Sequence, residues 1–231
     1  MQIPFPYLHM NTITVERKVL EKNEAVAQQN RILFESRQCF VINVVSSPGA
    51  GKTSILERTF ELLGKKIRLG VIEGDVQTDL DARRVARYDV PVVQIITHGA
   101  CHLDAALVRD ALDHLDGNLD VIIIENVGNL VCPANYDLGE NLKVVLLSTT
   151  EGDDKPLKYP AMFRNASVLV INKIDLLPHV QCDLQRMKEN ALNINPSLRV
   201  FETSATTGEG IPSWCAWLER KTLERKAVPS P

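Results

Sequence analysis

The chain has no apolar run long enough to cross a membrane, and its first residues lack the basic start of a secretory signal. The longest apolar stretches, such as residues 121–124 and 144–147, are only a few residues long, whereas a spanning helix needs about 20. Residues 1–7 contain no lysine or arginine, and residues 12–24 contain several charged side chains, unlike a signal peptide. We therefore expect a cytoplasmic protein without a membrane partner.

An excess of positive charge is also missing. The 231 residues carry a formal net charge of −3, and the isoelectric point of the sequence is about 6.0. Domains that bind nucleic acid or anionic lipid usually have a basic face or stripe. We therefore expect no nucleic-acid partner.

Closely paired cysteines are absent as well. The chain has five cysteines, none of them in a C-x-x-C pair. An odd number in a cytoplasmic chain of this size favours free thiols or metal ligands over a disulfide framework. We assign Cys39, Cys182 and Cys215 to packing or to the surface, and consider Cys101 and Cys132 as metal ligands below.

The sequence does contain a regular alternation of short apolar runs and helical stretches. This alternation predicts an α/β fold with a mainly parallel sheet that is covered by helices on both faces. We expect residues 1–36 to form a tail and an amphipathic helix packed on the core, residues 37–226 to form one nucleotide-binding domain, and residues 227–231 to form a flexible tail. The expected strands are 41–45, 68–72, 92–96, 121–125, 143–147, 168–171 and 199–202, and the expected helices are 14–35, 53–63, 80–87, 103–115, 182–193 and 211–225.

A glycine-rich segment follows the first expected strand. Residues 46–53 read Ser-Ser-Pro-Gly-Ala-Gly-Lys-Thr, close to the phosphate-binding pattern G-x-x-x-x-G-K-[ST]. In such loops glycines let the backbone N–H groups surround phosphate oxygens, the lysine supplies a positive charge, and the last hydroxyl binds Mg²⁺. Ser46 departs from the pattern, which has glycine there. We expect the nucleotide contacts to come from Gly49, Ala50, Gly51, Lys52, Thr53 and Ser54.

A second motif indicates which base is bound. Residues 172–175 read Asn-Lys-Ile-Asp and follow an expected strand, as does the guanine-specificity element of regulatory GTPases. A carboxylate at Asp175 can accept hydrogen bonds from the N1–H and the 2-amino group of guanine, and with adenine it would be left unpaired. Asn172 would brace the loop, the Lys173 stem would lie over the purine, and the Ser204–Ala205 loop would meet the guanine oxygen. GTP is therefore favoured over ATP.

Two acidic residues also follow strands at the same edge of the sheet. Asp75 closes the segment Glu73-Gly74-Asp75, and Glu125 ends the strand at 121–125. A carboxylate near the outer phosphate can bind Mg²⁺ or orient the attacking water. The alternative is that both residues only cap strands or helices. We favour roles for Lys52, Asp75 and Glu125 in catalysis, with Mg²⁺ held by Thr53, Asp75 and Glu125.

Cys101, His102 and Cys132 form a third group. Thiolate and imidazole suit Zn²⁺ and Ni²⁺, but three donors do not complete a tetrahedral structural site. Two subunits meeting at this edge would supply six donors and would couple metal binding to dimerisation. Cysteine is often simply a buried small hydrophobe, so spacing alone leaves this alternative open. Nearby His98 is expected to be an exposed loop residue rather than an additional ligand.

Three other functions are compatible with parts of the pattern. A metabolic kinase would use the phosphate loop, but the segment 172–175 argues against it. A metal buffer with incidental GTPase activity would bind metal equally well with GDP and GTP. A cysteine nucleophile at Cys101 is disfavoured because adjacent side chains on an extended segment, here Cys101 and His102, point to opposite faces.

Taken together, these motifs resemble the nickel-incorporation GTPases of the HypB family, which belong to the SIMIBI type of P-loop GTPase and help to mature [NiFe] hydrogenases. The resemblance runs from about residue 15 to residue 218. The related urease-accessory GTPases share the phosphate loop and the Asn-Lys-x-Asp motif but have a different metal segment, so they are the alternative. The matching segments are residues 46–53, 73–75, 101–105, 125–132, 137–140, 151–160 and 172–175.

The resemblance implies a three-layer P-loop NTPase fold and a homodimer that depends on GTP or GDP. It implies a metal site of Cys101, His102 and Cys132 at the dimer interface, with Ni²⁺ or Zn²⁺ as the metal. It also implies transfer of the metal, through a second nickel-maturation factor or a nickel-storing chaperone, toward the hydrogenase large subunit. Family members often carry an N-terminal cysteine motif or a histidine-rich stretch, whereas residues 1–40 hold only His9 and Cys39. We therefore expect only the weaker metal site of the GTPase domain.

Overall fold

Seven parallel strands form a single sheet in the computed structural model, which describes residues 15–77, 80–115 and 117–227. The strand order is β3-β2-β4-β1-β5-β6-β7, with every neighbouring pair parallel. The prediction of a mainly parallel sheet is confirmed. The strands are β1 (Phe40–Ser46), β2 (Leu69–Asp75), β3 (Val92–Ile96), β4 (Val121–Glu125), β5 (Leu142–Ser148), β6 (Val168–Asn172) and β7 (Arg199–Glu202).

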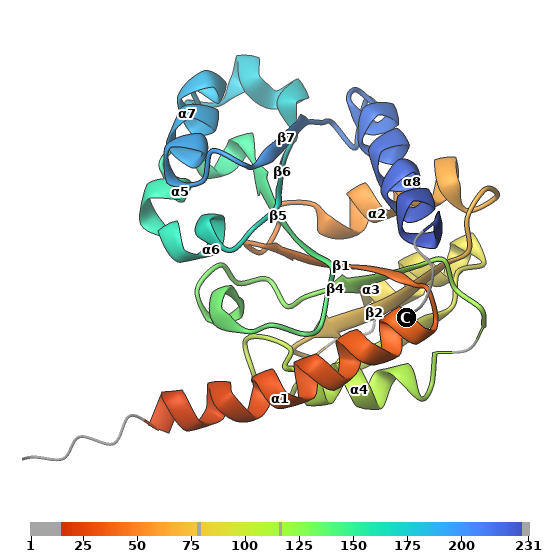
Figure 1. The fold of residues 1–231 in the computed structure, drawn as a ribbon. Helices are drawn as coiled ribbons and strands as arrows, with labels where there is room; N and C mark the ends of the chain where they lie inside the picture. The colour runs from red at the N-terminus through yellow and green to blue at the C-terminus, as the bar shows by residue number, and fades with distance from the viewer. Residues whose placement is uncertain (1–14, 78–79, 116, 228–231) are drawn as a thin grey trace, which may run out of the picture.

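Helices cover both faces of the sheet and give the three layers visible in Figure 1. One face carries α2, α3 and α8, and the other carries α1 and α4 over one half and α5, α6 and α7 over the other half. The predicted covering of both faces is confirmed. The helices are α1 (Val15–Ser36), α2 (Lys52–Leu63), α3 (Leu80–Val85), α4 (Ala105–Leu112), α5 (Lys155–Lys158), α6 (Pro160–Arg164), α7 (Leu184–Ile194) and α8 (Ile211–Ala227).

The central strand β1 shows why both layers form. Its side chains alternate between faces, as in any strand: Ile42 and Val44 pack under α2 and α8, whereas Val41 packs under α1 and α4. All seven β1 residues are buried, because each face is covered. At about 25 cal/mol per Å² of apolar surface, burial of this kind is the main favourable term in folding.

The long helix α1 is fixed to the rest of the molecule by two buried asparagines. Asn23 donates to Asp137 O (2.7 Å), and Asn30 donates to Ala105 O (2.8 Å) and Leu138 O (3.0 Å). The helix lies along α4 (Figure 1). Residues 1–14 and 228–231 lie outside the described part of the chain, so the tails expected at both ends stay predictions. The helix α8 itself continues to Ala227.

Some element boundaries differ from the sequence prediction. The segment Glu73-Gly74-Asp75 was expected after β2 but forms its last three residues, because Gly74 and Asp75 pair with Ile95 and Ile96 of β3. The helix expected over residues 103–115 is shorter at both ends, beginning after the N-cap Asp104, whose side chain accepts from Leu107 N. The short helices α5 and α6 were not predicted, since four or five residues are too few for a helical period.

No helix in the described ranges has the length and hydropathy needed to cross a membrane.

Candidate functional site

The glycine-rich loop connects the end of β1 to the start of α2. Gly49 and Gly51 have φ angles of 76° and 98°, a left-handed region that residues with a Cβ rarely adopt. Gly51 is the N-cap of α2, so the helix begins at Lys52. The N–H groups of the first turn of a helix have no partner within the helix, and they favour an anion. The local geometry is therefore that of a phosphate-binding loop.

Ser46, the departure from the phosphate-loop pattern, is compatible with this geometry. It is the last residue of β1 and is fully buried, and its φ angle is not in the left-handed region. Its hydroxyl donates to Ser47 O (2.7 Å) and accepts a hydrogen bond from Lys52 Nζ (3.1 Å). No glycine is needed at this position, and the serine positions the lysine.

Behind the loop lie two buried carboxyl groups on neighbouring strands. Glu125 accepts a hydrogen bond from Thr53 Oγ1 (2.8 Å), and Glu73 stands opposite Glu125 in the register of β2 and β4. Each is only 2% exposed, and one oxygen of each has no hydrogen-bond partner. Burial raises the pKa of both carboxyl groups. The pKa of Glu73 rises to about 8, because the neighbouring Glu125 charge adds to the effect of burial. Unpartnered buried carboxylate oxygens beside a threonine hydroxyl fit Mg²⁺, which prefers oxygen ligands.

Asp75 lies at the end of β2, at the same edge of the sheet. Its Oδ1 accepts a hydrogen bond from Gln77 N (2.8 Å), and the side chain is half-buried. Ser54, also expected at the nucleotide, accepts from Arg84 Nη2 (3.1 Å) of α3. Arg84 was not predicted, because a lone arginine on a short helix has no sequence signature.

Asn172 connects three segments of the expected guanine site. Its Nδ2 donates to Ala50 O in the phosphate loop (3.0 Å), and its Oδ1 accepts from Ala205 N (3.1 Å). Lys173, with a φ angle of 62°, donates from Nζ to Gly49 O (2.7 Å). The structure thus brings together two motifs that lie about 120 residues apart, as expected from the sequence.

A cavity of about 610 Å³ opens beside these residues. Asp175 lines it, and the Oδ1 of this carboxylate is buried without a hydrogen-bond partner. This oxygen is therefore able to accept a hydrogen bond from a bound base. The remaining lining residues include Gly51, Ser54, Arg58, Tyr88, Lys173 and Thr206.

The Ser204–Ala205 loop already uses its backbone donors. Ser204 N donates to Glu209 O (2.9 Å), and Ala205 N donates to Asn172 Oδ1. The expected contact with a guanine oxygen therefore stays a prediction. Arg58 of α2 contacts this loop by donating from Nε to Ala205 O (2.8 Å). This arginine could not be predicted, since its acceptor is a backbone carbonyl and leaves no pattern in the sequence.

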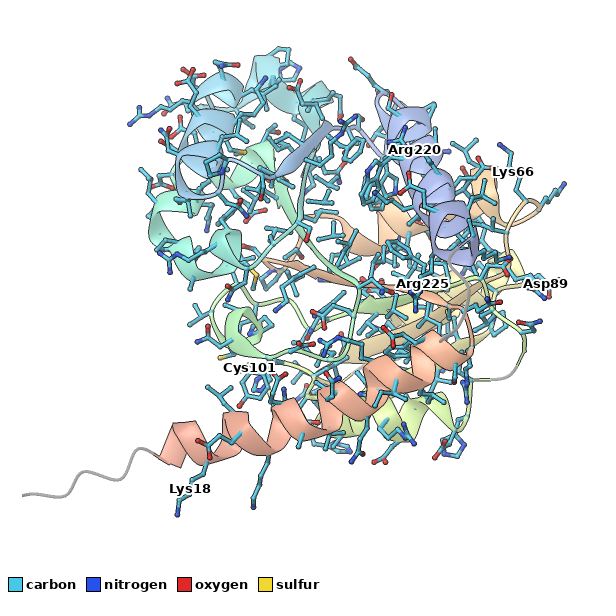
Figure 2. All side chains as sticks on the ribbon, in the orientation of Figure 1. Lys18, Lys66, Asp89, Cys101, Arg220 and Arg225 are labelled. Atoms are coloured by element: carbon cyan, nitrogen blue, oxygen red, sulfur yellow. The ribbon has the colours of Figure 1, made fainter. Side chains whose placement is uncertain are left out.

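Cys101, His102 and Cys132 come together, and their ligand atoms all lie within 4.8 Å of one another. Cys101 Sγ lies 3.7 Å from His102 Nδ1, and the His102 ring packs against the Tyr136 ring with centroids 4.0 Å apart. Figure 2 shows Cys101 on the side of the molecule where α1 lies, away from Lys66 and Arg220. Two thiols and an imidazole at this spacing form a donor set for a soft or borderline metal ion.

The protonation of this cluster has identifiable physical causes. The neighbouring Cys132 thiol raises the pKa of Cys101, and burial lowers the pKa of His102. The neutral form of the imidazole, which is the form that binds metal, is therefore favoured. Residues 101 and 102 form a bend, so the expectation that their side chains point to opposite faces of an extended segment is wrong. His98 is exposed and has a φ angle of 48°, and it is not in the cluster.

The three remaining cysteines are free thiols. Cys39 and Cys215 are buried in the two main core layers, and burial raises their pKa values to about 12 and about 11. Cys182 is half-buried. Their assignment to packing or surface agrees with these positions.

Comparison with known proteins places this geometry in a family. The model of the CobW/HypB/UreG nucleotide-binding domain matches residues 40–202. The hydrogenase maturation factor HypB of Azotobacter vinelandii is 53% identical over 212 residues, covering 90% of this chain and 69% of that protein.

Two solved structures have the same fold over most of their length. A crystal structure of HypB from Archaeoglobus fulgidus has a TM-score of 0.83 at 38% identity and covers 87% of this chain and 99% of the other. A structure of HypB from Helicobacter pylori in complex with nickel has a TM-score of 0.84 at 38% identity and covers 88% and 96%. This chain therefore belongs to the CobW/HypB/UreG family of nucleotide-binding domains and, within it, to the HypB hydrogenase maturation factors.

Proposed function

We propose that the protein is a GTP-hydrolysing metallochaperone, in which a GTP-dependent dimer switch delivers nickel during [NiFe] hydrogenase maturation. The observation that carries this proposal is the short path between its two sites. Glu125, the partner of Thr53 and the last residue of β4, lies only seven residues before Cys132, a member of the thiol–imidazole cluster, and one loop joins them. The same loop touches the phosphate loop, since a Cβ on Gly128 would lie 3.1 Å from Pro48.

The nucleotide part of the proposal assigns a role to each residue of the site. The phosphate contacts would come from residues 49–54, the base contacts from residues 172–175 and 204–205, and the charge on the outer phosphates from Lys52. Thr53, Asp75 and Glu125 would hold Mg²⁺, which supplies charge neutralisation to phosphoryl transfer. Unassisted switch GTPases turn over at about 10⁻⁴ to 10⁻² s⁻¹, and we expect intrinsic hydrolysis in this range.

The metal is cargo in this proposal, bound by Cys101, His102 and Cys132. Its ligand set suits both Ni²⁺ and Zn²⁺. Nickel is favoured because the H. pylori relative is described in complex with it. GTP would order the loop from Glu125 to Cys132 and bring two subunits together, so that hydrolysis releases or transfers the metal. We place the protein in the cytoplasm, with a second nickel-maturation factor, a nickel-storing chaperone and the hydrogenase large subunit as partners.

The test is equilibrium binding of Ni²⁺ and Zn²⁺ to metal-free protein, with GDP or a non-hydrolysable GTP analogue, together with the molecular mass in solution. We expect the GTP state to be dimeric and to differ from the GDP state in metal affinity or stoichiometry. Cys132→Ser should lose this metal while it still binds nucleotide, and Lys52→Ala should lose the nucleotide effect while it stays folded. Metal binding that ignores the nucleotide would instead indicate a passive metal store, and turnover above about 10 s⁻¹ would contradict a slow switch.

A further inference from the structure

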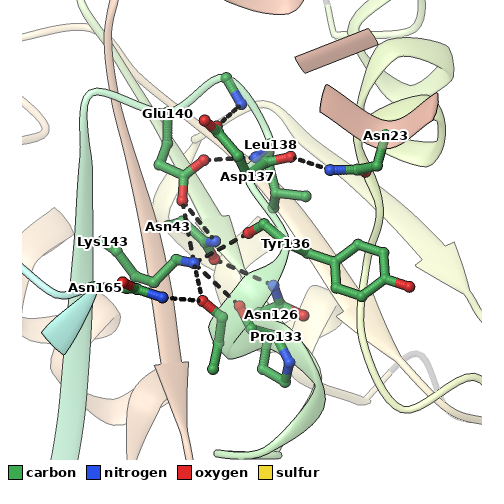
Figure 3. Close-up of polar contacts among 12 residues, drawn as sticks. Asn23, Asn43, Asn126, Pro133, Tyr136, Asp137, Leu138, Glu140, Lys143 and Asn165 are labelled. Carbon is green, nitrogen blue, oxygen red and sulfur yellow. Dashed lines mark hydrogen bonds and ion pairs between the residues drawn. The ribbon is translucent and has the colours of Figure 1, made fainter. Parts of the chain in front are cut away.

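A buried lysine lies beneath the segment that carries Cys132. Lys143, near the start of β5, has a side chain only 7% exposed. Its Nζ donates to three backbone carbonyls, those of Pro133 (3.0 Å), Ala134 (3.2 Å) and Tyr136 (3.0 Å). A lysine ammonium has three N–H donors, so all of them are used on the residues directly after Cys132 (Figure 3).

Glu140 is the ionic partner of this lysine inside the protein. Its Oε1 lies 3.9 Å from Lys143 Nζ and accepts from Asn43 Nδ2 (3.1 Å), and its Oε2 accepts from Leu138 N (2.7 Å). Burial raises the pKa of Glu140 and lowers that of Lys143, while the charge of each partner opposes the shift of the other. Buried charges are costly unless they are paired and hydrogen-bonded, and here both conditions are met.

Asn126 holds the other segment of the cluster. Its Oδ1 accepts from Leu103 N (3.0 Å), the residue after His102, and from Val127 N (2.9 Å). Its Nδ2 donates to Asn43 Oδ1 (3.2 Å). Both asparagines are at most 1% exposed. A continuous chain of buried polar contacts therefore runs from the backbone beside His102, through Asn126, Asn43, Glu140 and Lys143, to the backbone beside Cys132. Figure 3 shows this chain from Asn126 onward.

A second bridge joins the same two segments from the side of α1. Asn23 Oδ1 accepts from Ala105 N (2.8 Å), and its Nδ2 donates to Asp137 O (2.7 Å). The segments after His102 and after Cys132 are therefore fixed relative to each other at two places. Cys101 and Cys132 are free thiols and no disulfide joins them, so their separation depends on such backbone supports.

We propose that Lys143 and Asn126 are positioning residues that set the geometry of the Cys101–His102–Cys132 cluster, Lys143 from the Cys132 side and Asn126 from the His102 side. The nickel readout of this inference rests on the proposed function, whereas its thiol readout does not. Groups that orient metal ligands typically contribute 10- to 100-fold to metal affinity. The same range applies here, because a small displacement of either segment separates the sulfur atoms.

The variants are Lys143→Met and Asn126→Ala, with Lys188→Met as the matched control. Lys188 also forms an ion pair, with Glu202 (2.7 Å), but this pair is partly exposed, joins α7 to β7 and lies outside this chain of contacts. Lys143→Gln retains N–H donors, and Asn126→Asp retains the acceptor for Leu103 N. These two variants should recover part of the loss, and they replace any variant that fails to fold by circular dichroism.

Two measurements test the proposal. Titration of Ni²⁺ into the metal-free protein should give at least a 10-fold weaker affinity and a weaker thiolate-to-nickel absorption band in the two variants but not in the control. Oxidation by diamide, which takes two electrons and two protons from a thiol pair, should form the Cys101–Cys132 disulfide at least 10-fold more slowly in the same variants, as judged by peptide mapping.

Each outcome decides the point. Folded Lys143→Met and Asn126→Ala that match the wild type in both measurements would overturn the positioning roles, and so would a control that fails equally. If the wild-type protein binds no nickel at the cluster but the disulfide rates separate as expected, the proposed cargo fails and the positioning roles stand.

Discussion

At the scale of single residues, Gly51 is where the phosphate loop tolerates least change. Its φ angle is 98°, and a Cβ there would lie 2.5 Å from Asn172 Nδ2. Gly51→Ala should therefore strain the backbone by about 1–2 kcal/mol and also displace the asparagine that joins the phosphate loop to the Ser204–Ala205 loop. We expect at least a 10-fold loss of GTP affinity in a fluorescent-nucleotide titration.

Gly117→Ala is the matched control for that substitution. Gly117 has a φ angle of 104°, but the nearest atom to its Cβ would be Leu119 Cδ2 at 3.7 Å, an ordinary contact. This variant should show the loss of stability from backbone strain and bind GTP like the wild type. Equal GTP affinities in the two alanine variants would mean that the contact with Asn172 does not matter.

The cysteines should differ sharply in reactivity, because the thiolate is the reactive form. Burial raises the pKa of Cys39 to about 12 and that of Cys215 to about 11. The Cys132 thiol also raises the pKa of Cys101, but Cys101 is exposed to the reagent. Iodoacetamide at pH 8 should modify Cys101 in the native protein and leave Cys39 and Cys215 intact until unfolding, as read by peptide mass spectrometry. Ni²⁺ should protect Cys101 and Cys132 but not Cys182, and equal protection of Cys182 would argue against a specific site.

Site residues could be predicted from the sequence where they lie in a short contiguous motif. Lys52, Thr53 and Asn172 lie in motifs whose spacing reflects one strand and one turn, so their positions could be predicted. Lys143 and Arg58 act on backbone carbonyls of distant segments. Every residue has a backbone carbonyl, so the residue types of the acceptors do not show that a lysine or arginine binds them.

At the scale of elements, Asp120 joins the start of β2 to the end of α8. It accepts hydrogen bonds from Arg68 N (2.9 Å) and Arg68 Nε (3.1 Å) and pairs with Lys226 Nζ (2.6 Å). Burial alone would raise the pKa of Asp120, but the contacts from Arg68 and Lys226 outweigh burial and hold the pKa well below its usual range. The charged form is therefore stabilised by folding.

Asp120→Asn should lower the free energy of unfolding by about 1.5–3 kcal/mol at pH 7, the range for hydrogen bonds to charged groups. Because the folded pKa is depressed, this stability is present above the unfolded pKa of about 3.9 and is lost as the pH falls below it. The difference between wild type and variant in urea unfolding should therefore shrink from pH 5 toward pH 2. Asp154→Asn, which breaks an exposed pair with Lys158, is the control and should change nothing measurable.

The elements themselves could be predicted where their apolar period was long enough. The helix at Val15–Ser36 and the strand at Arg199–Glu202 lie within one residue of their expected bounds. The end of β2 was missed because Gly74 and Asp75 are poor strand formers and pair only because β3 lies beside them. Tertiary pairing, not local preference, extends that strand.

At the scale of the whole molecule, the order of the strands explains why distant motifs meet. β1 lies in the centre between β4 and β5, so the phosphate loop at its end adjoins Glu125 on one side, and β6 with Asn172 follows β5 on the other side. The sequence predicted a parallel sheet and a shared edge for these loops. It did not predict the strand order, because apolar runs of similar composition do not indicate which neighbour they pair with.

The proposed nucleotide site and the Cys101–His102–Cys132 cluster belong to one domain, so coupling between them can be measured through the stability of the whole domain. A ligand at 100 times its dissociation constant stabilises the folded state by about 2.7 kcal/mol, which raises the melting temperature of a domain of this size by roughly 2–4 °C per kcal/mol. If the sites were independent, the stabilisations by Ni²⁺ and by a Mg²⁺-bound GTP analogue would add.

A switch requires a coupling free energy, typically 1–3 kcal/mol, and the coupling acts equally in both directions. We expect the joint stabilisation to depart from the sum by this amount with the GTP analogue and by less with GDP. Cys132→Ser should retain the nucleotide shift and lose both the nickel shift and the departure, whereas additive shifts in the wild type would mean that the loop from Glu125 to Cys132 joins the sites without coupling them.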